Sequence, residues 1–192
     1  MAKKTLCEFA DITSANTCGE SIAGTATTIY IGFKNDLKSL PKFKEPDESD
    51  EDMSAFASVD DTTGFQFVTG KCFYKWEIDT DSGQLTSTSV AQQKGFSNQL
   101  SFKIAKMTPQ ISALLRVLNN RKDAFVAIPE GDKYRMIYNP DRNIKIDSGG
   151  ISYDSGTTPD SESGTTVTIS VPAPAPAIYY TGEVSTTPAV GG

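Results

Sequence analysis

Short runs of β-branched and aromatic residues, separated by clusters of turn-forming residues, recur along most of this 192-residue chain. Residues 25–34 (TATTIYIGFK) are typical, because such side chains favour extended backbone. Residues 98–107 alternate, with Leu100, Phe102 and Ile104 on one face, which predicts a half-buried strand. Further predicted strands comprise residues 64–79 in two pieces, 84–90, 123–128, 133–139, 143–147, 165–171 and 177–184. Residues 64–79 and 84–90 are expected to form a hairpin around a glycine-containing turn. The spacing predicts about eight to ten strands in a mainly β fold, either a β-sandwich or a barrel.

One segment has a helical rather than a strand period. Thr108 is suited to the N-cap, and Pro109 fits the first helical position. The pair Asn119 and Asn120 favours a stop, because Asn tolerates the left-handed cap. An apolar stripe at i, i+3, i+4 and i+7 consists of Ile111, Leu114, Leu115 and Leu118. We predict one helix over about residues 109–119, flanking the sheets.

Both ends and one internal segment differ in composition from the predicted strands. Residues 1–24 are small and polar and predict an N-terminal arm, and residues 185–192 predict a flexible C-terminal tail. Between them, residues 25–184 are expected to form a single β-sandwich or barrel domain. Within that domain, residues 35–64 predict a long charged loop. In this region Lys34, Lys38, Lys42 and Lys44 precede Glu45, Asp47, Glu48, Asp50, Glu51 and Asp52.

The composition excludes several classes of function. The chain has no histidine, which removes serine triads, zincins and histidine-based facial triads. Its formal net charge is −6, and its isoelectric point of about 4.7 disfavours wrapping of DNA, which depends on Lys and Arg. No phosphate-binding or dinucleotide-binding glycine motif occurs. We therefore expect a protein that is not an enzyme.

The cysteines and the N-terminus bear on the compartment. Cys7, Cys18 and Cys72 are odd in number and form no CxxC motif, so we expect free thiols in a reducing compartment. The alternative is one disulfide between two of them. The first twenty residues lack the apolar run of a signal peptide, and no stretch of about 18 apolar residues predicts a membrane span. The expected location is a cytoplasm.

Two acidic stretches begin like metal-binding loops without completing one. Residues 79–83 (DTDSG) open like an EF-hand loop, but Gly83 stands at its fifth position rather than its sixth. Val90 then stands where a bidentate Glu belongs. Residues 45–52 are dense in carboxylates, but no glycine turn gathers them into a cage. We predict no metal site and no cofactor.

The order of these elements resembles the major tail tube proteins of long-tailed bacteriophages. A polar arm leads to TTIYIGFK, a long charged loop leads to FYKWEIDTDSG, and a strand, a helix and a strand follow in SFKIAKMTPQISALLRVLNNRKDAFVAI. A glycine-rich loop then leads to the closing GTTVTISVPAPAPAIYYTGEV. That family shares a β-barrel or sandwich with a flanking helix, as does the type VI secretion tube protein. The likeness covers most of residues 25–184 and is one of layout, without a catalytic motif.

The resemblance implies a structural virion protein that binds copies of itself. Such subunits form hexameric rings, and the rings stack into a tube, joined to other tail proteins, through which DNA passes without sequence-specific contact. The protein would lie in the virion tail and, before assembly, in the host cytoplasm. The long loop would reach the next ring. We predict inter-subunit contacts through Lys34, Lys38, Lys42, Lys44, Asp47, Glu48, Asp50, Glu51, Asp52, Arg116, Arg121 and Lys122, with the last three facing solvent or a neighbour.

Other functions stay open on the sequence. A tail terminator or a baseplate ring protein would have a similar layout. A β-sandwich binding module of a virion fibre or a cell surface is the alternative from another class, and it would recognise carbohydrate or a host receptor through exposed aromatic residues such as Trp76. A carboxylate-based glycosidase is the third reading, since acidic residues are many and their distances are not readable from sequence.

Overall fold

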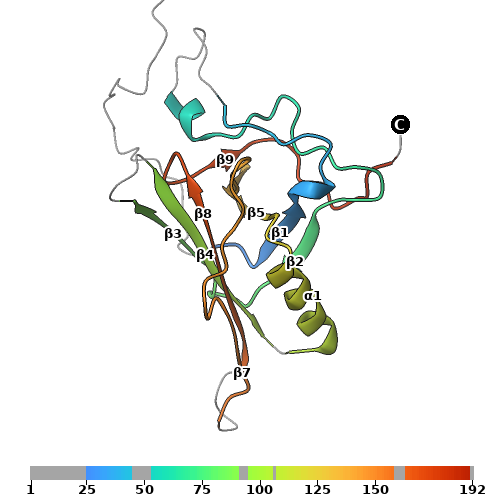
Figure 1. Cartoon of the computed structure of the whole chain (residues 1–192), viewed down its shortest axis with the longest axis vertical. Helices are drawn as coiled ribbons and strands as arrows, with labels where there is room; N and C mark the ends of the chain where they lie inside the picture. Colours follow the sequence, from blue (N-terminus) through green and yellow to red (C-terminus); the bar gives the residue numbers. More distant parts are fainter. Residues whose placement is uncertain (1–24, 45–52, 91–94, 106, 158–162, 191–192) are drawn as a thin grey trace, which may run out of the picture.

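The structure is a computed structural model and describes residues 25–44, 53–90, 95–105, 107–157 and 163–190 (Figure 1). Its described residues form two antiparallel sheets and one α-helix. The first sheet has the order β2-β1-β5-β6-β9 and the second the order β3-β4-β8-β7. The two sheets pack as a sandwich rather than a closed barrel, which confirms the predicted mainly β fold class and selects the sandwich.

The first sheet is built from β1 (Thr28–Phe33), β2 (Tyr74–Glu77), β5 (Ala124–Glu130), β6 (Lys133–Ile137) and β9 (Tyr179–Tyr180). The second is built from β3 (Gln84–Ser89), β4 (Phe96–Ala105), β7 (Ile151–Asp154) and β8 (Gly164–Ala173). The remaining elements are the short 3-10 helices η1 (Lys34–Asp36) and η2 (Met53–Ala57) and the helix α1 (Pro109–Asn120). From β1 onward the chain changes sheet after every second strand, and α1 lies in the crossing from β4 to β5.

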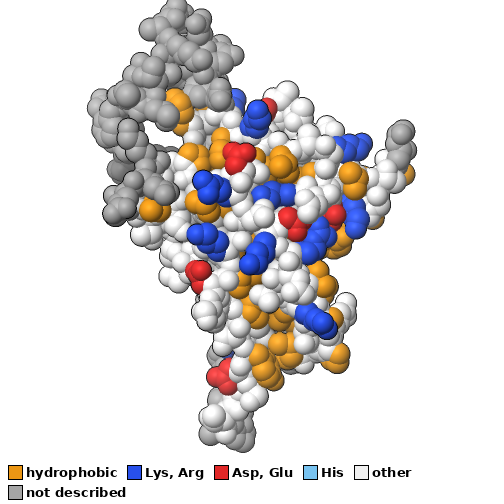
Figure 2. All heavy atoms as spheres, in the orientation of Figure 1, with side chains coloured by type: hydrophobic (Ala, Val, Ile, Leu, Met, Phe, Trp, Pro, Cys, Tyr) orange, Lys and Arg blue, Asp and Glu red, His pale blue; other side chains and the backbone are white. Residues whose placement is uncertain are grey.

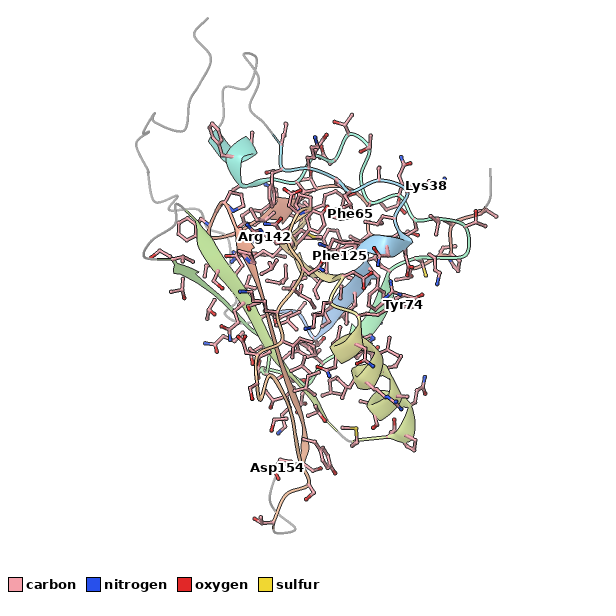
Figure 3. The ribbon with its side chains drawn as sticks, in the orientation of Figure 1. Lys38, Phe65, Tyr74, Phe125, Arg142 and Asp154 are labelled. Carbon is pink, nitrogen blue, oxygen red and sulfur yellow. The ribbon has the colours of Figure 1, made fainter. Side chains whose placement is uncertain are left out.

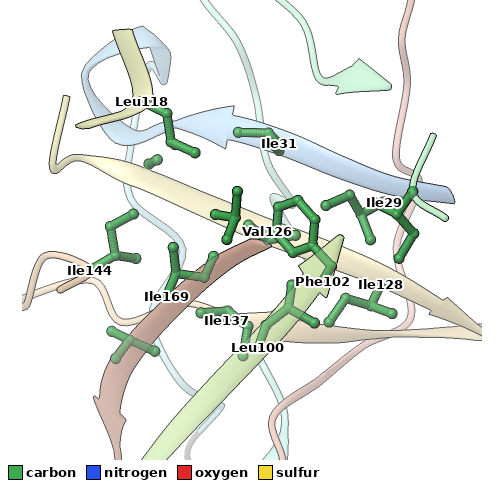
Figure 4. Packing of buried hydrophobic residues seen from close by; sticks show 14 of the residues in the cluster. Ile29, Ile31, Leu100, Phe102, Leu118, Val126, Ile128, Ile137, Ile144 and Ile169 are labelled. Atoms are coloured by element: carbon green, nitrogen blue, oxygen red, sulfur yellow. The ribbon is translucent and has the colours of Figure 1, made fainter. Parts of the chain in front are cut away.

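The space between the two sheets is filled mainly by branched aliphatic side chains, and we call this cluster the aliphatic core (Figure 4). Alternation along the strands explains its composition, since Leu100, Phe102 and Ile104 point inward from β4 as the sequence predicts. The helix α1 adds Leu115 and Leu118, which are buried against the same cluster. The aliphatic core therefore has a sheet on each side and a helix along one flank.

The opposite face of the first sheet carries a second cluster, which we call the aromatic core. Half of its buried members are Phe or Tyr, with Phe125 of β5 at the centre. The Phe125 ring stacks on Phe65 with centroids 4.8 Å apart (Figure 3), and Phe65 meets Tyr138 and Tyr180 edge to face. No second sheet covers this face in the described part of the chain; irregular segments before β2 and after β9 cover it instead.

Residues 35–64, predicted to be a long charged loop, contribute to that cover. Val59 is buried in the aromatic core, and isolated bridges join Phe43 to Val59 and Ser58 to Tyr179. The acidic stretch 45–52 lies outside the described residues, as do the arm 1–24 and Cys7 and Cys18. Cys72 is a free thiol. Residues 185–190 of the predicted tail run beside residues 70–73 and exchange backbone hydrogen bonds with them.

Three local predictions are wrong. The hairpin expected between residues 64–79 and 84–90 does not form, because β2 and β3 belong to different sheets and residues 78–83 carry the chain between them. The strand expected at 143–147 is an isolated bridge at Lys145, and β7 lies instead in the predicted glycine-rich loop. The helix ends with Arg121 in extended conformation rather than with a left-handed Asn.

Candidate functional site

A large, mainly apolar hollow lies between α1 and β2, and we call it the α1–β2 groove. It comprises two adjoining hollows of about 590 and 300 Å³ that share Trp76, Gln110 and Leu114. Tyr74, labelled in Figure 3, and Val117 border the larger one, and both side chains are exposed. An open apolar hollow of this kind is a candidate for binding a partner.

Local sequence explains how α1 forms one wall of the groove. The Thr108 hydroxyl accepts a hydrogen bond from the Ile111 amide at 3.2 Å, and Pro109 occupies the first turn, as predicted. The predicted apolar stripe is only partly buried. Leu115 and Leu118 face the aliphatic core, whereas Leu114 remains 41 % exposed and lines the groove. The helix thus has an outer apolar row that the core does not use.

The other wall of the groove is an open sheet edge. β2 pairs with β1 on one side, and within the described residues it pairs with no strand on the other. The Ile78 amide donates to the Thr27 carbonyl at 2.9 Å, which fixes the alternation along β2. By that alternation the amides and carbonyls of Lys75 and Glu77 point away from β1. An edge of this kind is a template for adding another strand.

A charged cluster closes the end of the groove nearest the C-terminus of α1. The Arg121 guanidinium donates to Asp123 at 2.8 Å, lies 3.4 Å from Asp36, and sits 3.9 Å above the Phe33 ring. Hydrogen bonds from Arg121 to the two carboxylates raise the pKa of Arg121, Asp123 contributing most. Partial burial acts to raise the pKa of Asp123, but the hydrogen bonds from Arg121 and the Asn35 amide outweigh it and lower that pKa.

A second candidate surface is the outward face of the second sheet. Alternation and register place a near-continuous set of short polar side chains there, which we call the hydroxyl face. Its members are Gln84, Thr86, Thr88, Ser97, Gln99, Ser101, Lys103, Ser152, Asp154, Thr166, Thr168, Ser170 and Pro172. Ser101 and Thr168 share a hydrogen bond of 3.1 Å across β4 and β8. Only Lys103 and Asp154 of this set carry a charge.

The predicted inter-subunit residues differ in burial and in their partners. Lys34 is buried, and its ammonium donates to the carbonyls of Asn139 and Arg142 at 3.3 and 2.9 Å, so the fold itself uses it. Burial lowers the pKa of Lys34, and Asp123 and Asp141 oppose that shift. Arg121, predicted to face solvent or a neighbour, has a side chain that is 33 % exposed, and its guanidinium is paired with Asp36 and Asp123. The exposed members are Lys38, Lys42, Lys44, Arg116 and Lys122, whereas Asp47, Glu48, Asp50, Glu51 and Asp52 lie outside the described residues.

The net charge is distributed unevenly between the described residues and the rest. Eleven of the 24 acidic residues lie outside the described ranges, against four of the 18 basic ones. The described body therefore has 14 basic and 13 acidic side chains and is close to neutral. Basic side chains spread over the middle of the face drawn in Figure 2, and hydrophobic ones gather beside α1. The formal charge of −6 thus does not apply to the described surface.

Sequence reasoning missed both candidate surfaces, although their signals were present. The hydroxyl face appears in the sequence as Ser, Thr and Gln at every second position of residues 84–88 and 97–101. The groove depends on which helix positions the core leaves uncovered, and the sequence does not determine that. Within the described ranges, no group of three or more Cys, Asp or Glu residues is placed to hold a metal ion, and no helix is long and apolar enough to cross a membrane.

Comparisons with protein-family models, with curated proteins and with solved structures found no match to this chain.

Proposed function

We propose that this protein is a structural virion protein, a subunit of a phage tail tube that assembles into stacked hexameric rings. DNA would pass through the tube without sequence-specific contact. The tail tube assignment comes from the order of elements in the sequence, which resembles that family. The observation that carries the proposal further is the hydroxyl face, which we place toward the lumen.

The chemistry of the hydroxyl face suits a surface over which DNA slides. DNA binds proteins mainly through Lys and Arg that replace the counterions of its phosphates. Among the described residues this face carries only Lys103 and, through its bridge to Ser170, Lys145. Short hydroxyl and amide side chains stay hydrated and present no apolar wedge to a base step. The resemblance to tail tube proteins implies an acidic lumen, and the net charge of −6 is compatible with it. The near-neutral body makes a weakly charged polar lumen the better proposal.

Open sheet edges support self-assembly as the general mode of action. The second sheet ends at β3 and β7, which are exposed along most of their length, and the first sheet ends at β2. Free edges in an isolated subunit are a liability that closure into a ring removes. The six acidic residues within 45–52, a stretch without a basic residue, add long-range electrostatics that salt would screen.

Electron microscopy and light scattering on the purified full-length chain test the assembly. We expect rings and tubes, and a strictly monomeric protein at about millimolar concentration would contradict a tube subunit. The lumen is tested by thiol labelling in a background with the native cysteines replaced by Ser. Thr168→Cys on the hydroxyl face should react with a bulky maleimide in the monomer and be protected in tubes. Ser112→Cys on the exposed side of α1 is the matched control, and equal protection of both would refute the lumen assignment.

A binding module is the second candidate, favoured by the aromatic side chains at the groove. Tyr74 is 41 % exposed, and the partly buried Trp76 lies next to it. Aromatic side chains bordering a hollow can stack on a sugar ring. A glycan array with the wild type and with Tyr74→Ala distinguishes this function. Clear hits that Tyr74→Ala removes, in a protein that stays monomeric, would favour the binding module over the tube.

A further inference from the structure

The α1–β2 groove and the free edge of β2 form one continuous surface without a partner among the described residues. We propose that this surface binds the N-terminal segment of a second copy of the chain, with residues 6–12 (LCEFADI) lying in the groove. The inference rests on the self-assembly proposed above and names a contact that joins two subunits. It does not depend on the tube being the final assembly.

The groove and the segment have matching chemistry. The walls include Leu114 and Val117 from α1 and Trp76 from β2, so an occupant must bring apolar side chains. Residues 6–12 contain Leu, Phe and Ile among two acidic residues, and they are the most apolar part of the first 20 residues. The Lys75 ammonium on the outer edge already donates to the Glu77 carboxylate at 3.1 Å, so the match rests on apolar contact rather than on charge.

The backbone of the edge supports an extended occupant. Residues 70–73 already accept the C-terminal segment of their own chain, since the Gly70 amide donates to the Ala189 carbonyl at 2.9 Å and the Phe73 amide to the Ser185 carbonyl at 3.2 Å. The next outward-pointing groups along the same edge belong to Lys75 and Glu77. A second extended segment would continue that line of hydrogen bonds, as in other cases of strand addition.

Chain length favours a second copy over the same copy as the source of the segment. The N-terminal segment joins the body at Thr25, and Thr27 pairs with Ile78 at the far end of β2. Residues 13–24 then separate the body from residues 6–12, and in extended form they span about 40 Å. A domain of this size has a diameter of about 40 Å. The spacer therefore reaches an adjacent subunit, whereas folding back onto the four-residue β2 would leave most of it looped out.

The native cysteines provide a direct test, because Cys7 lies within the proposed contact segment and Cys72 lines the groove. The full-length protein is treated with a short bismaleimide and resolved by denaturing gel electrophoresis. We expect dimers and higher oligomers whose formation requires both Cys7 and Cys72. Cys18→Ser is the matched control and should leave these products unchanged. A Cys7–Cys72 link found only within single chains would overturn binding between copies.

Variants in the groove extend the test without disturbing the core. Val117→Asp adds a charge at a side chain that is 46 % exposed and should reduce the cross-linked product by about tenfold, because it buries a charge under the segment. Ala113→Asp adds the same charge to an exposed position of α1 that does not line the groove, and it should have no effect. Equal yields from the two variants would contradict the proposal.

A peptide measurement decides the matter if thiol reactivity limits the cross-link. A fluorescent peptide of residues 1–13, with Ser in place of Cys7, should bind the full-length chain saturably in fluorescence anisotropy. Binding should weaken by about tenfold with Val117→Asp in the protein or Phe9→Asp in the peptide. The absence of saturable binding would overturn the proposal. Cross-linking in a protein that forms no tubes would support this contact and contradict the tail tube function. Tubes that show neither cross-linking nor peptide binding would support the tail tube function and contradict this contact.

Discussion

The two faces of the first sheet are closed in different ways. The aliphatic core lies between two sheets, and Val126 and Ile128 of β5 interleave there with side chains from β4 and β8. The aromatic core lies on the opposite face of β5, where irregular segments take the place of a second sheet. Regular strands present side chains at a fixed period, so branched aliphatic residues of similar size fill the first space. The irregular segments over the aromatic core present their side chains without such a period.

Aromatic side chains fill that irregular space. A single ring buries as much surface as two or three small side chains, and edge-to-face contacts connect Phe65, Phe73 and Tyr138. Side chains also supply the hydrogen bonds that irregular backbone cannot find in a sheet. The Tyr138 hydroxyl donates to the Pro41 carbonyl at 2.7 Å, and the Tyr180 hydroxyl accepts from the Phe65 amide at 3.4 Å. The aromatic core thus fills the space under the irregular segments and also holds their backbone through hydrogen bonds.

The largest expected effect is on the aliphatic core. Leu115→Asp places a carboxylate where the native side chain is buried between α1 and the sheets, and we expect no soluble folded protein. Leu114→Asp, at the neighbouring exposed position, is the matched control and should fold. Far-ultraviolet circular dichroism and thermal unfolding measure the difference. A folded Leu115→Asp protein would mean that α1 does not close this core.

Loss of the central ring should be the next largest effect. Phe125→Ala leaves a large cavity in the aromatic core and should lower the free energy of unfolding by about 3–5 kcal/mol. Val126→Ala, on the adjacent residue facing the aliphatic core, removes fewer atoms and should cost less, about 1–2 kcal/mol. Urea unfolding of both variants gives the comparison. A larger loss for Val126→Ala would show that the aromatic core is a weak covering rather than a second core.

A glycine in β1 is expected to matter because of the same ring. Gly32 lies opposite Phe125 in the register of β1 and β5, and a Cβ added at Gly32 would lie 2.4 Å from the Phe125 Cζ. Gly32→Ala should therefore cost about 1–3 kcal/mol in unfolding free energy through overpacking. Combined with Phe125→Leu, its cost should shrink, since the obstructing ring is gone. Strict additivity of the two changes would contradict a direct clash.

Removing one hydroxyl tests whether hydrogen bonds from the aromatic core hold the irregular segments. Tyr138→Phe leaves the Pro41 carbonyl without its donor and should cost about 1 kcal/mol in unfolding free energy. Tyr153→Phe, at a side chain that is 53 % exposed, removes a hydroxyl in water and should change nothing measurable. Chemical unfolding of the two variants checks this. If they behave alike, the segment around Pro41 is held by packing alone.

The smallest effect is expected in the charged cluster around Arg121. The lowered pKa of Asp123 means that its ionised form stabilises the folded state above the pKa of an unfolded Asp, near 3.9. That stabilisation is lost as the pH falls through the folded-state pKa. Asp123→Asn should be less stable than the wild type at pH 6 by about 1 kcal/mol or less, because Arg121 is partly exposed. The gap should close toward pH 2; a constant gap would remove the electrostatic explanation.

Local signals explain the predictions that the structure confirms. The N-cap at Thr108, the first-turn Pro109 and the helical period lie within one short stretch, so α1 is readable without knowing its neighbours. The inward face of β4 follows from alternation alone. The prediction of a hairpin was wrong because the turn signal in residues 79–83 is the same whether the chain turns back within one sheet or crosses to the other sheet. β7 was missed because an exposed edge strand needs little apolar patterning.

The sequence by itself determined the mainly β class, the position of the helix and the alternation of the long strands, because each depends on residues close together in the chain. Only the tertiary structure decided which strands share a sheet, since β1 pairs with β2 and β5 across long separations in the sequence. It also decided that Lys34 is buried, because carbonyls of residues 139 and 142 come to meet its ammonium. Finally, it decided that Leu114 lines a groove instead of the core, since the sheets cover only part of the apolar stripe of α1.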